Sequence, residues 1–178
     1  MSGKLEIIMG NMFSGKTSEL IRRLKRHRAI GDNILVINSK KDSRNESEVL
    51  QTHDGVTFRC IKTDSLDEVL DTIAFHDTKV VAIDESQFFE GLRHFVQCAL
   101  AKNKHVLVAG LDGDFRQQTF GELLTLVPLA DEVTKLKALC MDCMDGTPGP
   151  FTRRTVLNMN QELIGDSNAY KAVCRKHL

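Results

Sequence analysis

Short, largely apolar runs recur along the first three quarters of the chain, and polar stretches separate them. The runs are Leu5–Met9, Ile34–Ile37, Val80–Ile83, Val106–Ala109 and Val133–Leu136. Runs of this length and composition are typical of strands that are covered on both faces of a sheet. We therefore expect each run to be a strand of one sheet.

A first helix is expected over residues 16–30, because its apolar residues follow helical spacing. Leu20, Ile21 and Leu24 form one stripe, and Gly31 follows the last turn. The basic residues lie mostly off this stripe: Arg22, Arg23, Lys25 and Arg26. We interpret them as a solvated helix face rather than a nucleic-acid patch.

Two further helices are indicated. Residues 65–68 have the composition of a capping box, and the apolar positions of the helix after it are Leu66, Val69, Leu70 and Ile73. The other helix is marked by Leu92, Phe95, Val96 and Ala99. Strands that alternate with helices predict an α/β fold of the P-loop NTPase type: a mostly parallel sheet with helices on both faces.

Two regions depart from this alternation. Residues 39–63 are polar, and we expect a long mobile loop there. After Leu139 the chain becomes rich in turn residues. We therefore divide it into an N-terminal α/β domain, 1–139, and a small C-terminal domain, 140–178.

Composition narrows the class of protein. The 178 residues include 24 Lys+Arg and 24 Asp+Glu, so the net charge is zero. Broad binding to nucleic acid or to a membrane surface needs an excess of one sign and is not expected. The N-terminus lacks the pattern of a signal peptide, and five cysteines are an odd number for a disulfide framework. We therefore expect the cysteines to be reduced thiols or metal ligands and the protein to reside in a reducing cytosol.

A phosphate-binding pattern follows the first strand. Gly10, Asn11, Met12, Phe13, Ser14, Gly15, Lys16 and Thr17 fit G-x-x-x-x-G-K-[ST]. The glycines let successive N–H groups point at phosphate oxygens, Lys16 reaches the β- and γ-phosphates, and the Thr17 hydroxyl binds Mg²⁺. The alternative is a plain glycine-rich turn.

Two carboxylates follow the third strand. Asp84 stands where the second Mg²⁺ ligand of a P-loop protein is expected. Glu85 should point the other way along an extended chain and can accept a proton from an attacking hydroxyl. Two alternatives remain open: Glu85 caps the next helix, or it activates water in an ATPase.

Metal-ligand types occur in two pairs near the C-terminus. Cys140, Cys143, Cys174 and His177 have the spacing of a structural zinc site, which would be closed to catalysis. The alternative is a set of unrelated thiols. Cys60 and Cys98 have no such partner and are expected in or near the core.

Five aromatic residues are expected next to the nucleotide site: Phe88, Phe89, Phe115, Phe120 and Tyr170, and the four phenylalanines follow strand ends. A core role is the default for each phenylalanine. Their position after the strands favours a site for a flat ring.

The combined motifs resemble the zinc-containing class of thymidine kinases from animal cells, poxviruses and many bacteria. The matching segments are Gly10–Thr17, Lys41–Arg44, Thr52–Asp54, Asp84–Phe89, Leu111–Phe115, Val127–Leu129 and the Cys/His pairs. The resemblance extends from about Leu5 to His177. Asn11 replaces a common proline, Ser86 a common glycine, and His177 the fourth cysteine of the animal enzymes.

The resemblance implies roles for particular residues. Glu85 would be the catalytic base. ATP would contact residues 10–17 together with Asp42, Ser43, Arg44, Asp84 and Gln87. Thymidine would contact Met12, Phe88, Leu111, Phe115, Phe120, Thr152, Gln161, Glu162, Leu163, Ile164, Gly165 and Tyr170. Zinc would be structural, and Mg²⁺ would accompany ATP at Thr17 and Asp84.

The resemblance also implies salvage of thymidine to its 5′-monophosphate, a homotetramer, and feedback inhibition by thymidine triphosphate. No nucleic acid or membrane is expected as a partner. Two rival functions remain: a regulatory or motor ATPase, and a zinc-ribbon binding module with a degenerate nucleotide site.

Overall fold

The computed structural model describes residues 2–42, 48–51, 56–158, 160–163 and 168–178. Its main feature is a six-stranded sheet in the order β5-β2-β6-β7-β1-β8. Every neighbouring pair in this sheet is parallel, as the sequence pattern predicts. The strands are β1 (Lys4–Gly10), β2 (Ile34–Ser39), β5 (Ile61–Thr63), β6 (Val80–Ile83), β7 (His105–Leu111) and β8 (Glu132–Leu136).

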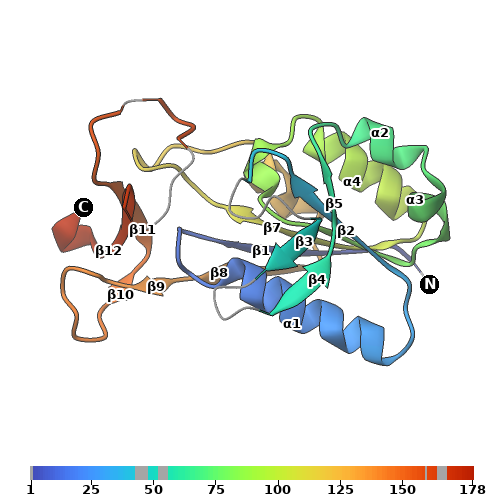
Figure 1. The fold of residues 1–178 in the computed structure, drawn as a ribbon, viewed down its shortest axis with the longest axis horizontal. Coiled ribbons are helices and arrows are strands. Elements are labelled where there is room, and N and C mark those ends of the chain that lie inside the picture. The colour runs from blue at the N-terminus through green and yellow to red at the C-terminus, as the bar shows by residue number, and fades with distance from the viewer. Residues whose placement is uncertain (1, 43–47, 52–55, 159, 164–167) are drawn as a thin grey trace.

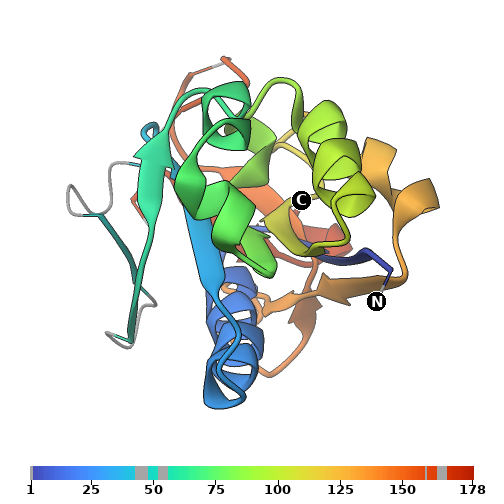
Figure 2. The same cartoon turned by 90° about the vertical axis from the view of Figure 1, so that its right-hand side faces the viewer.

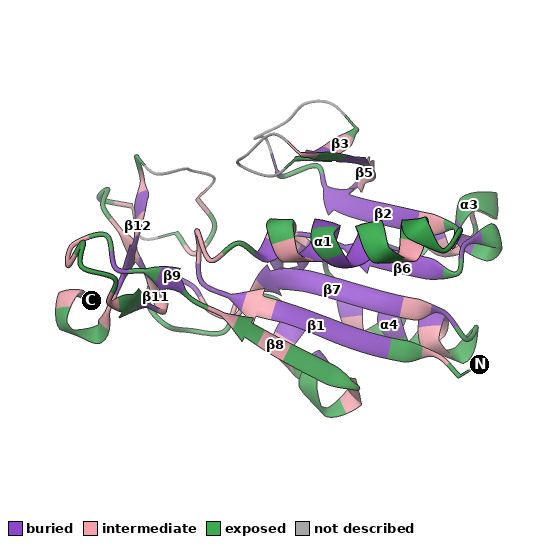
Figure 3. Cartoon of the chain, turned by 90° about the horizontal axis from the view of Figure 1, so that it is seen from below, coloured by how far each residue is buried: buried purple, intermediate pink, exposed green. Residues whose placement is uncertain are grey.

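Helices cover both faces of this sheet (Figure 1). Helix α1 (Lys16–Ala29) lies on one face, and α4 (Leu92–Ala101) lies on the other with α2 (Asp67–Leu70) and α3 (Ile73–Asp77). Alternate residues of β1 enter the two apolar layers, since Ile7 packs with the α4 side and Ile8 with the α1 side. Burial on both faces explains why the central strands are almost continuously apolar (Figure 3).

The polar segment 39–63 contains more regular structure than the loop that we expected. Strands β3 (Val49–Gln51) and β4 (Thr57–Arg59) form an antiparallel hairpin, and β5 joins the main sheet at its edge beside β2 (Figure 2). Of the described residues in this hairpin, Leu50 and Phe58 alone are buried, and they pack against the α1 side of the core. Strands with a single buried residue are too short to produce a periodic signal. Residues 43–47 and 52–55 lie outside the described part of the chain.

The single helix predicted after Ser65–Glu68 is wrong in two respects. Leu66 occupies the N-cap position of α2, and its side chain has no oxygen that could cap a helix. The helix also ends within one turn, and α3 begins after Thr72, whose hydroxyl accepts a hydrogen bond from the N–H of Phe75. The restart turns the helix so that Phe75 is buried and Ile73 is 79% exposed.

The C-terminal region contains short strands that the sequence pattern did not predict. Strand β9 (Ala138–Leu139) pairs with β10 (Pro148–Gly149), and β11 (Phe151–Arg154) pairs with β12 (Tyr170–Val173), both antiparallel. The remaining elements are the 3₁₀ helices η1 (Ser86–Phe88), η2 (Leu123–Leu129) and η3 (Arg175–His177). The described residues include no helix with the length and apolar character needed to cross a membrane.

Candidate active site and metal centre

The phosphate-loop pattern forms the connection between β1 and α1. Gly10 is required by close approach, since a Cβ there would lie 2.4 Å from the carbonyl oxygen of Leu136. Phe13 and Gly15 have positive φ angles of 64° and 83°, so the loop curls before the helix begins at Lys16. A loop of this form directs backbone N–H groups and the helix N-terminus toward an anion.

Two side chains of the pattern have partners that fit their expected chemistry. Nζ of Lys16 donates a 2.8 Å hydrogen bond to the carbonyl oxygen of Asn11 and so spans the loop. Oγ1 of Thr17 donates to Oδ2 of Asp84 over 2.8 Å. The fold therefore brings together the two expected Mg²⁺ ligands, which are 67 positions apart in sequence. An oxygen pair of this kind suits Mg²⁺.

Asp84 and Glu85 do not lie on an extended chain, in contrast to our expectation. Glu85 has φ 48° and ψ 41°, in the left-handed region, and η1 begins directly after it. This turn, rather than strand alternation, separates the two carboxylates. Asp84 is buried, whereas Glu85 is partly exposed and accepts a 2.6 Å hydrogen bond from Nε2 of Gln87.

Gln87 connects the ends of β6 and β7. Its Nε2 contacts Glu85, while its Oε1 accepts a 3.0 Å hydrogen bond from the N–H of Leu111. Gly110 and Gly121 permit this arrangement, because a Cβ at either position would lie within 3 Å of Gln87 atoms. Gln87 is thus placed to orient Glu85.

The aromatic residues separate into three groups. Phe89 is buried in the α4 side of the core, so its default role holds. Phe88 and Phe120 meet edge to face with ring centroids 5.7 Å apart, and both are partly exposed. Phe115 and Tyr170 share a neighbour, Arg154. Its Cζ lies 3.8 Å from the ring centroid of Phe115 and 5.1 Å from that of Tyr170.

The segment between the two Cys/His pairs contacts the main sheet region at several points. Nε2 of Gln161 donates to Oδ2 of Asp114 over 2.8 Å, and Glu162 pairs with Nζ of Lys41 at 3.0 Å. The hydroxyl of Tyr170 donates to the carbonyl oxygen of Leu163. Ile164 and Gly165 were also predicted to bind substrate, and both lie outside the described residues.

Three further ATP contacts were predicted at residues 42–44, and the structure describes Asp42 among them. Its buried carboxylate accepts a 2.9 Å hydrogen bond from Nδ2 of Asn38. Nζ of Lys62 donates to its backbone oxygen over 2.7 Å. Ser43 and Arg44 lie outside the described residues, as do all three of the positions 52–54 that carry part of the family resemblance.

The phosphate loop is joined directly to the C-terminal region. The N–H of Met12 donates to Oγ1 of Thr152 over 3.1 Å. Nδ2 of Asn11 donates to the carbonyl oxygens of Gly149 and Phe151, and its Oδ1 accepts from the N–H of Ala138. Asn11 is only 2% exposed. Its connecting role could not be seen in the sequence, because its partners lie 127–140 positions away.

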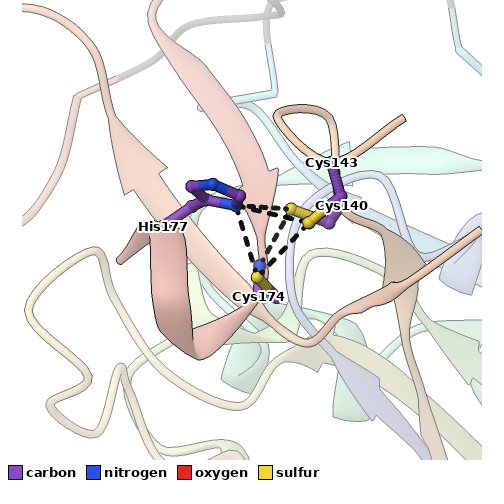
Figure 4. A group of neighbouring side chains, drawn as sticks. All are labelled: Cys140, Cys143, Cys174 and His177. Atoms are coloured by element: carbon purple, nitrogen blue, oxygen red, sulfur yellow. Dashed lines mark hydrogen bonds between the residues drawn. The ribbon is translucent and has the colours of Figure 1, made fainter. Parts of the chain in front are cut away.

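The predicted zinc ligands converge at the far end of the molecule from the N-terminus (Figures 1 and 4). Nδ1 of His177 lies 3.6, 3.4 and 3.4 Å from the sulfur atoms of Cys140, Cys143 and Cys174. The sulfur atoms of Cys143 and Cys174 are 3.7 Å apart. Ligands at ordinary Zn–S and Zn–N distances on a tetrahedron would be about 3.5–3.8 Å from one another. The four residues therefore fit a closed zinc site and do not behave as unrelated thiols.

The protonation states of these thiols are consistent with a cation. Burial by itself raises the pKa of the Cys140 thiol. Hydrogen bonds outweigh this effect and lower the pKa to about 6; they come from the backbone N–H groups of Cys174, Cys143 and Asp142 and from the ring of His177. Burial and the neighbouring thiols raise the pKa of Cys143 to about 11. The protein alone thus favours a first thiolate and opposes a second, which a bound cation would stabilise.

Arg153 braces the two halves of this cluster. Its guanidinium donates to Oδ2 of Asp142, between Cys140 and Cys143, and to the backbone oxygen of His177. Lys171 also pairs with Asp142, at 3.1 Å. The two remaining cysteines lie elsewhere: Cys60 is buried on the α1 side of the core, as expected, and Cys98 is partly exposed on α4.

Together, the fold and the site define a P-loop nucleotide-binding α/β protein with a Cys₃His cluster. The flagellar accessory protein FlaH of Methanocaldococcus jannaschii has a similar fold, with a TM-score of 0.52 over 78% of this chain and 72% of that one. Its 16% identity carries the comparison no further than the fold.

Sequence comparisons identify the family. The profile of the thymidine kinase family matches residues 3–178. Thymidine kinase a of Arabidopsis thaliana is 41% identical, over 99% of this chain and 75% of the plant protein. The thymidine kinase of rabbit fibroma virus is 40% identical, over 98% of this chain and 95% of the viral protein. The cytosolic thymidine kinase of Cricetulus griseus is 39% identical, over 97% of this chain and 72% of that protein. The chain belongs to the thymidine kinase family.

Proposed function

We propose that this protein transfers the γ-phosphate of ATP to the 5′-hydroxyl of thymidine, in nucleotide salvage. The observation that carries the proposal is a phosphate loop whose Thr17 meets Asp84 at 2.8 Å, beside Glu85, in a chain that matches thymidine kinases over nearly its whole length. The reaction needs positioning and charge stabilisation more than covalent chemistry.

The phosphate loop supplies the charge stabilisation. The N–H groups of residues 10–17 and the start of α1 would hold the β- and γ-phosphates, with Lys16 moving from the Asn11 carbonyl to the transferring group. Mg²⁺ held at Thr17 and Asp84 would neutralise charge on the phosphate oxygens. The proposed ATP contacts also include Asp42, Ser43, Arg44 and Gln87. Gln87 would in addition orient Glu85 through their hydrogen bond.

Glu85 is the proposed general base. Its carboxylate is held by Gln87, is partly exposed, and adjoins the metal-binding Asp84, so it can accept the 5′-hydroxyl proton as the oxygen attacks in line. Thymidine would lie among Met12, Phe88, Leu111, Phe115 and Phe120. Residues of the C-terminal segment would close over it: Thr152, Gln161, Glu162, Leu163, Ile164, Gly165 and Tyr170.

Zinc at Cys140, Cys143, Cys174 and His177 would be structural, because four protein ligands leave no position for substrate. We also propose that residues 1–139 and 140–178 act as separate domains. By analogy with the family, we propose a cytosolic homotetramer that thymidine triphosphate inhibits.

The test is an ATP-dependent phosphorylation assay across the four deoxynucleosides and deoxyuridine. Thymidine should be the preferred acceptor, and ATP turnover should require it. Rapid ATP hydrolysis without nucleoside would instead favour a regulatory or motor ATPase. Absence of any phosphorylation, combined with salt-sensitive DNA binding, would favour a zinc-ribbon binding module.

A further inference from the structure

Arg154 is the last residue of β11, and its guanidinium group holds the segment that follows. Nη1 donates to the carbonyl oxygens of Asn158 and Asn160, over 2.8 and 2.5 Å. Nη2 donates to the carbonyl oxygen of Gln161 over 3.1 Å. One side chain therefore binds three backbone groups of a segment that has little regular structure.

The same guanidinium contacts two of the aromatic residues. It stacks on Phe115, with Cζ 3.8 Å from the ring centroid, and Phe115 belongs to the turn that follows β7. Nη2 also donates a 2.7 Å hydrogen bond to the hydroxyl of Tyr170, which itself donates to the carbonyl oxygen of Leu163. Arg154 thus links the β7 turn and β12 to Asn158 and residues 160–163.

The arrangement is not the one that stability alone would favour. Nε of Arg154 is buried and has no hydrogen-bond partner among the described residues. Leaving a buried donor unpaired is unfavourable, and such exceptions concentrate at functional sites. The other contacts outweigh the cost because a planar guanidinium can stack and donate several hydrogen bonds at once.

We propose that Arg154 is a positioning residue for the nucleoside. It fixes the backbone at Asn158 and over residues 160–163 against Phe115 and Tyr170, and it thereby determines the affinity and selectivity for the base. This inference rests on the proposed function, since it assigns the assembled segment to thymidine. No role for Arg154 followed from the sequence, where it is one of two adjacent arginines.

The position calls for arginine in particular. Lysine would keep the positive charge, but a single ammonium group cannot bind three carbonyl oxygens and a hydroxyl while lying flat on a ring. Arg154→Lys is therefore the conservative variant, and Arg154→Met keeps the length of the side chain without its donors.

Steady-state kinetics give the first test. Arg154→Met should raise the KM for thymidine by about 10- to 100-fold, the scale expected for several hydrogen bonds to a charged group. The KM for ATP should stay within about threefold, because the phosphate loop is held by other contacts. Preference for thymidine over deoxycytidine should fall, and Arg154→Lys should lie between Arg154→Met and the unaltered protein.

Arg116→Met is the matched control. Arg116 is the other arginine near Phe115, with Cζ 5.2 Å from the ring centroid, but it pairs with Asp114 and is largely exposed. Its removal should leave both KM values within about twofold, because its guanidinium is exposed and its ion pair with Asp114 is long, at 3.7 Å. Equal rises in both KM values for Arg154→Met, or an unchanged thymidine KM, would overturn the proposal.

Tyr170 supplies a readout that does not depend on activity. It is the only tyrosine, and the chain has no tryptophan, so intrinsic fluorescence reports on the hydroxyl that Arg154 binds. Arg154→Met should change the emission of the free protein, whereas Arg116→Met should not. If the unaltered protein phosphorylates no nucleoside, the proposed function fails and the proposal for Arg154 fails with it, while a change in emission would still show that Arg154 holds Tyr170.

Discussion

Glu85 shows how one backbone conformation can give adjacent carboxylates different surroundings. Its left-handed φ and ψ place the side chain next to Gln87, while Asp84 remains buried against Thr17. A non-glycine residue in this region is uncommon and carries a conformational cost. The cost is consistent with a position selected for chemistry.

Glu85→Gln should lower kcat by roughly 10²- to 10⁴-fold, the usual contribution of a general base. The KM for ATP should change little, because the amide keeps the size of the side chain and can still accept the hydrogen bond of Gln87. Steady-state kinetics on this variant and on Glu90→Gln, an exposed control, provide the measurement. Turnover within a few-fold of the unaltered protein would exclude Glu85 as the base.

Asn11 is a second residue whose importance depends on distant partners. Asn11→Ala removes a buried side chain that makes three hydrogen bonds to β9, β10 and β11, so the free energy of unfolding should fall by about 1–3 kcal/mol. Asn33→Ala is the control, because Asn33 is exposed and its side chain makes one long hydrogen bond, to the carbonyl oxygen of Asp77. Urea titration measures both, and equal small losses would contradict a joining role for Asn11.

At the scale of elements, β11 performs three tasks with consecutive residues. Thr152 accepts a hydrogen bond from the phosphate loop, Arg153 braces the Cys/His cluster, and Arg154 holds the segment after the strand. Successive side chains of a strand point to opposite faces, so neighbours can serve different sites. This short strand contacts the phosphate loop, the Cys/His cluster and the segment that follows it.

Helix α1 and strand β1 are joined by an ionic network that the sequence pattern did not reveal. Glu6 is 7% exposed and accepts hydrogen bonds from Lys4 and Arg23, and its Oε1 lies 3.0 Å from Nε2 of His105. Arg23 also pairs with Glu19 and Glu132. Arg23 is therefore buried, and our interpretation of the basic residues of α1 as a solvated face is wrong for this one.

The network predicts a specific loss of stability in acid. Burial raises the pKa of Glu6, but its hydrogen bonds to Lys4 and Arg23 and the charge of His105 outweigh it and lower the pKa to about 2, from 4.5. A lowered pKa stabilises the folded state above pH 4.5, and that stabilisation disappears as the pH falls toward 2. It is on the order of 3 kcal/mol.

Glu6→Gln should consequently be less stable than the unaltered protein at neutral pH, and the difference should shrink between pH 4.5 and 2. Urea titrations across that range measure it. Glu68→Gln, at an exposed position of α2, should show no such pH-dependent difference. A gap between Glu6→Gln and the unaltered protein that is constant with pH would contradict the role assigned to the Glu6 carboxylate.

At the scale of the whole molecule, the Cys/His cluster joins the two ends of a long segment. Cys140 and Cys143 precede β10, while Cys174 and His177 follow β12. Closing a loop of this length on one ion removes much of its conformational freedom. Seven of the twelve residues that we assign to thymidine, from Thr152 to Tyr170, lie within this closed segment, whereas the phosphate loop lies outside it.

Cys143→Ser or Cys174→Ser should therefore weaken thymidine binding far more than ATP binding. Calorimetry with each ligand, on protein of assayed zinc content, measures both affinities. Cys98→Ser is the control, since Cys98 lies on α4 away from the cluster. Equal losses for both ligands would indicate global unfolding. Unchanged thymidine affinity without zinc would refute the proposed dependence of thymidine binding on the zinc site.

The sequence by itself determined the features that depend on local order. Continuous apolar runs predicted five of the six strands of the main sheet, the spacing of Leu92 to Ala99 predicted α4, and Gly10–Thr17 predicted the phosphate loop. Cys140-x-x-Cys143 and Cys174-x-x-His177 predicted the metal centre for the same reason, because each pair is a local motif. Signals of this kind need no knowledge of distant contacts.

Only the tertiary structure decided which distant groups meet. The left-handed turn at Glu85, the burial of Arg23, and the contacts of Asn11 and Arg154 all depend on partners brought together by the fold. The interruption between α2 and α3 is similar, since burial of Phe75 outweighs the helical spacing of Ile73. A polar side chain acquires its role from the hydrogen bonds it can complete, and these are set by packing rather than by its neighbours in sequence.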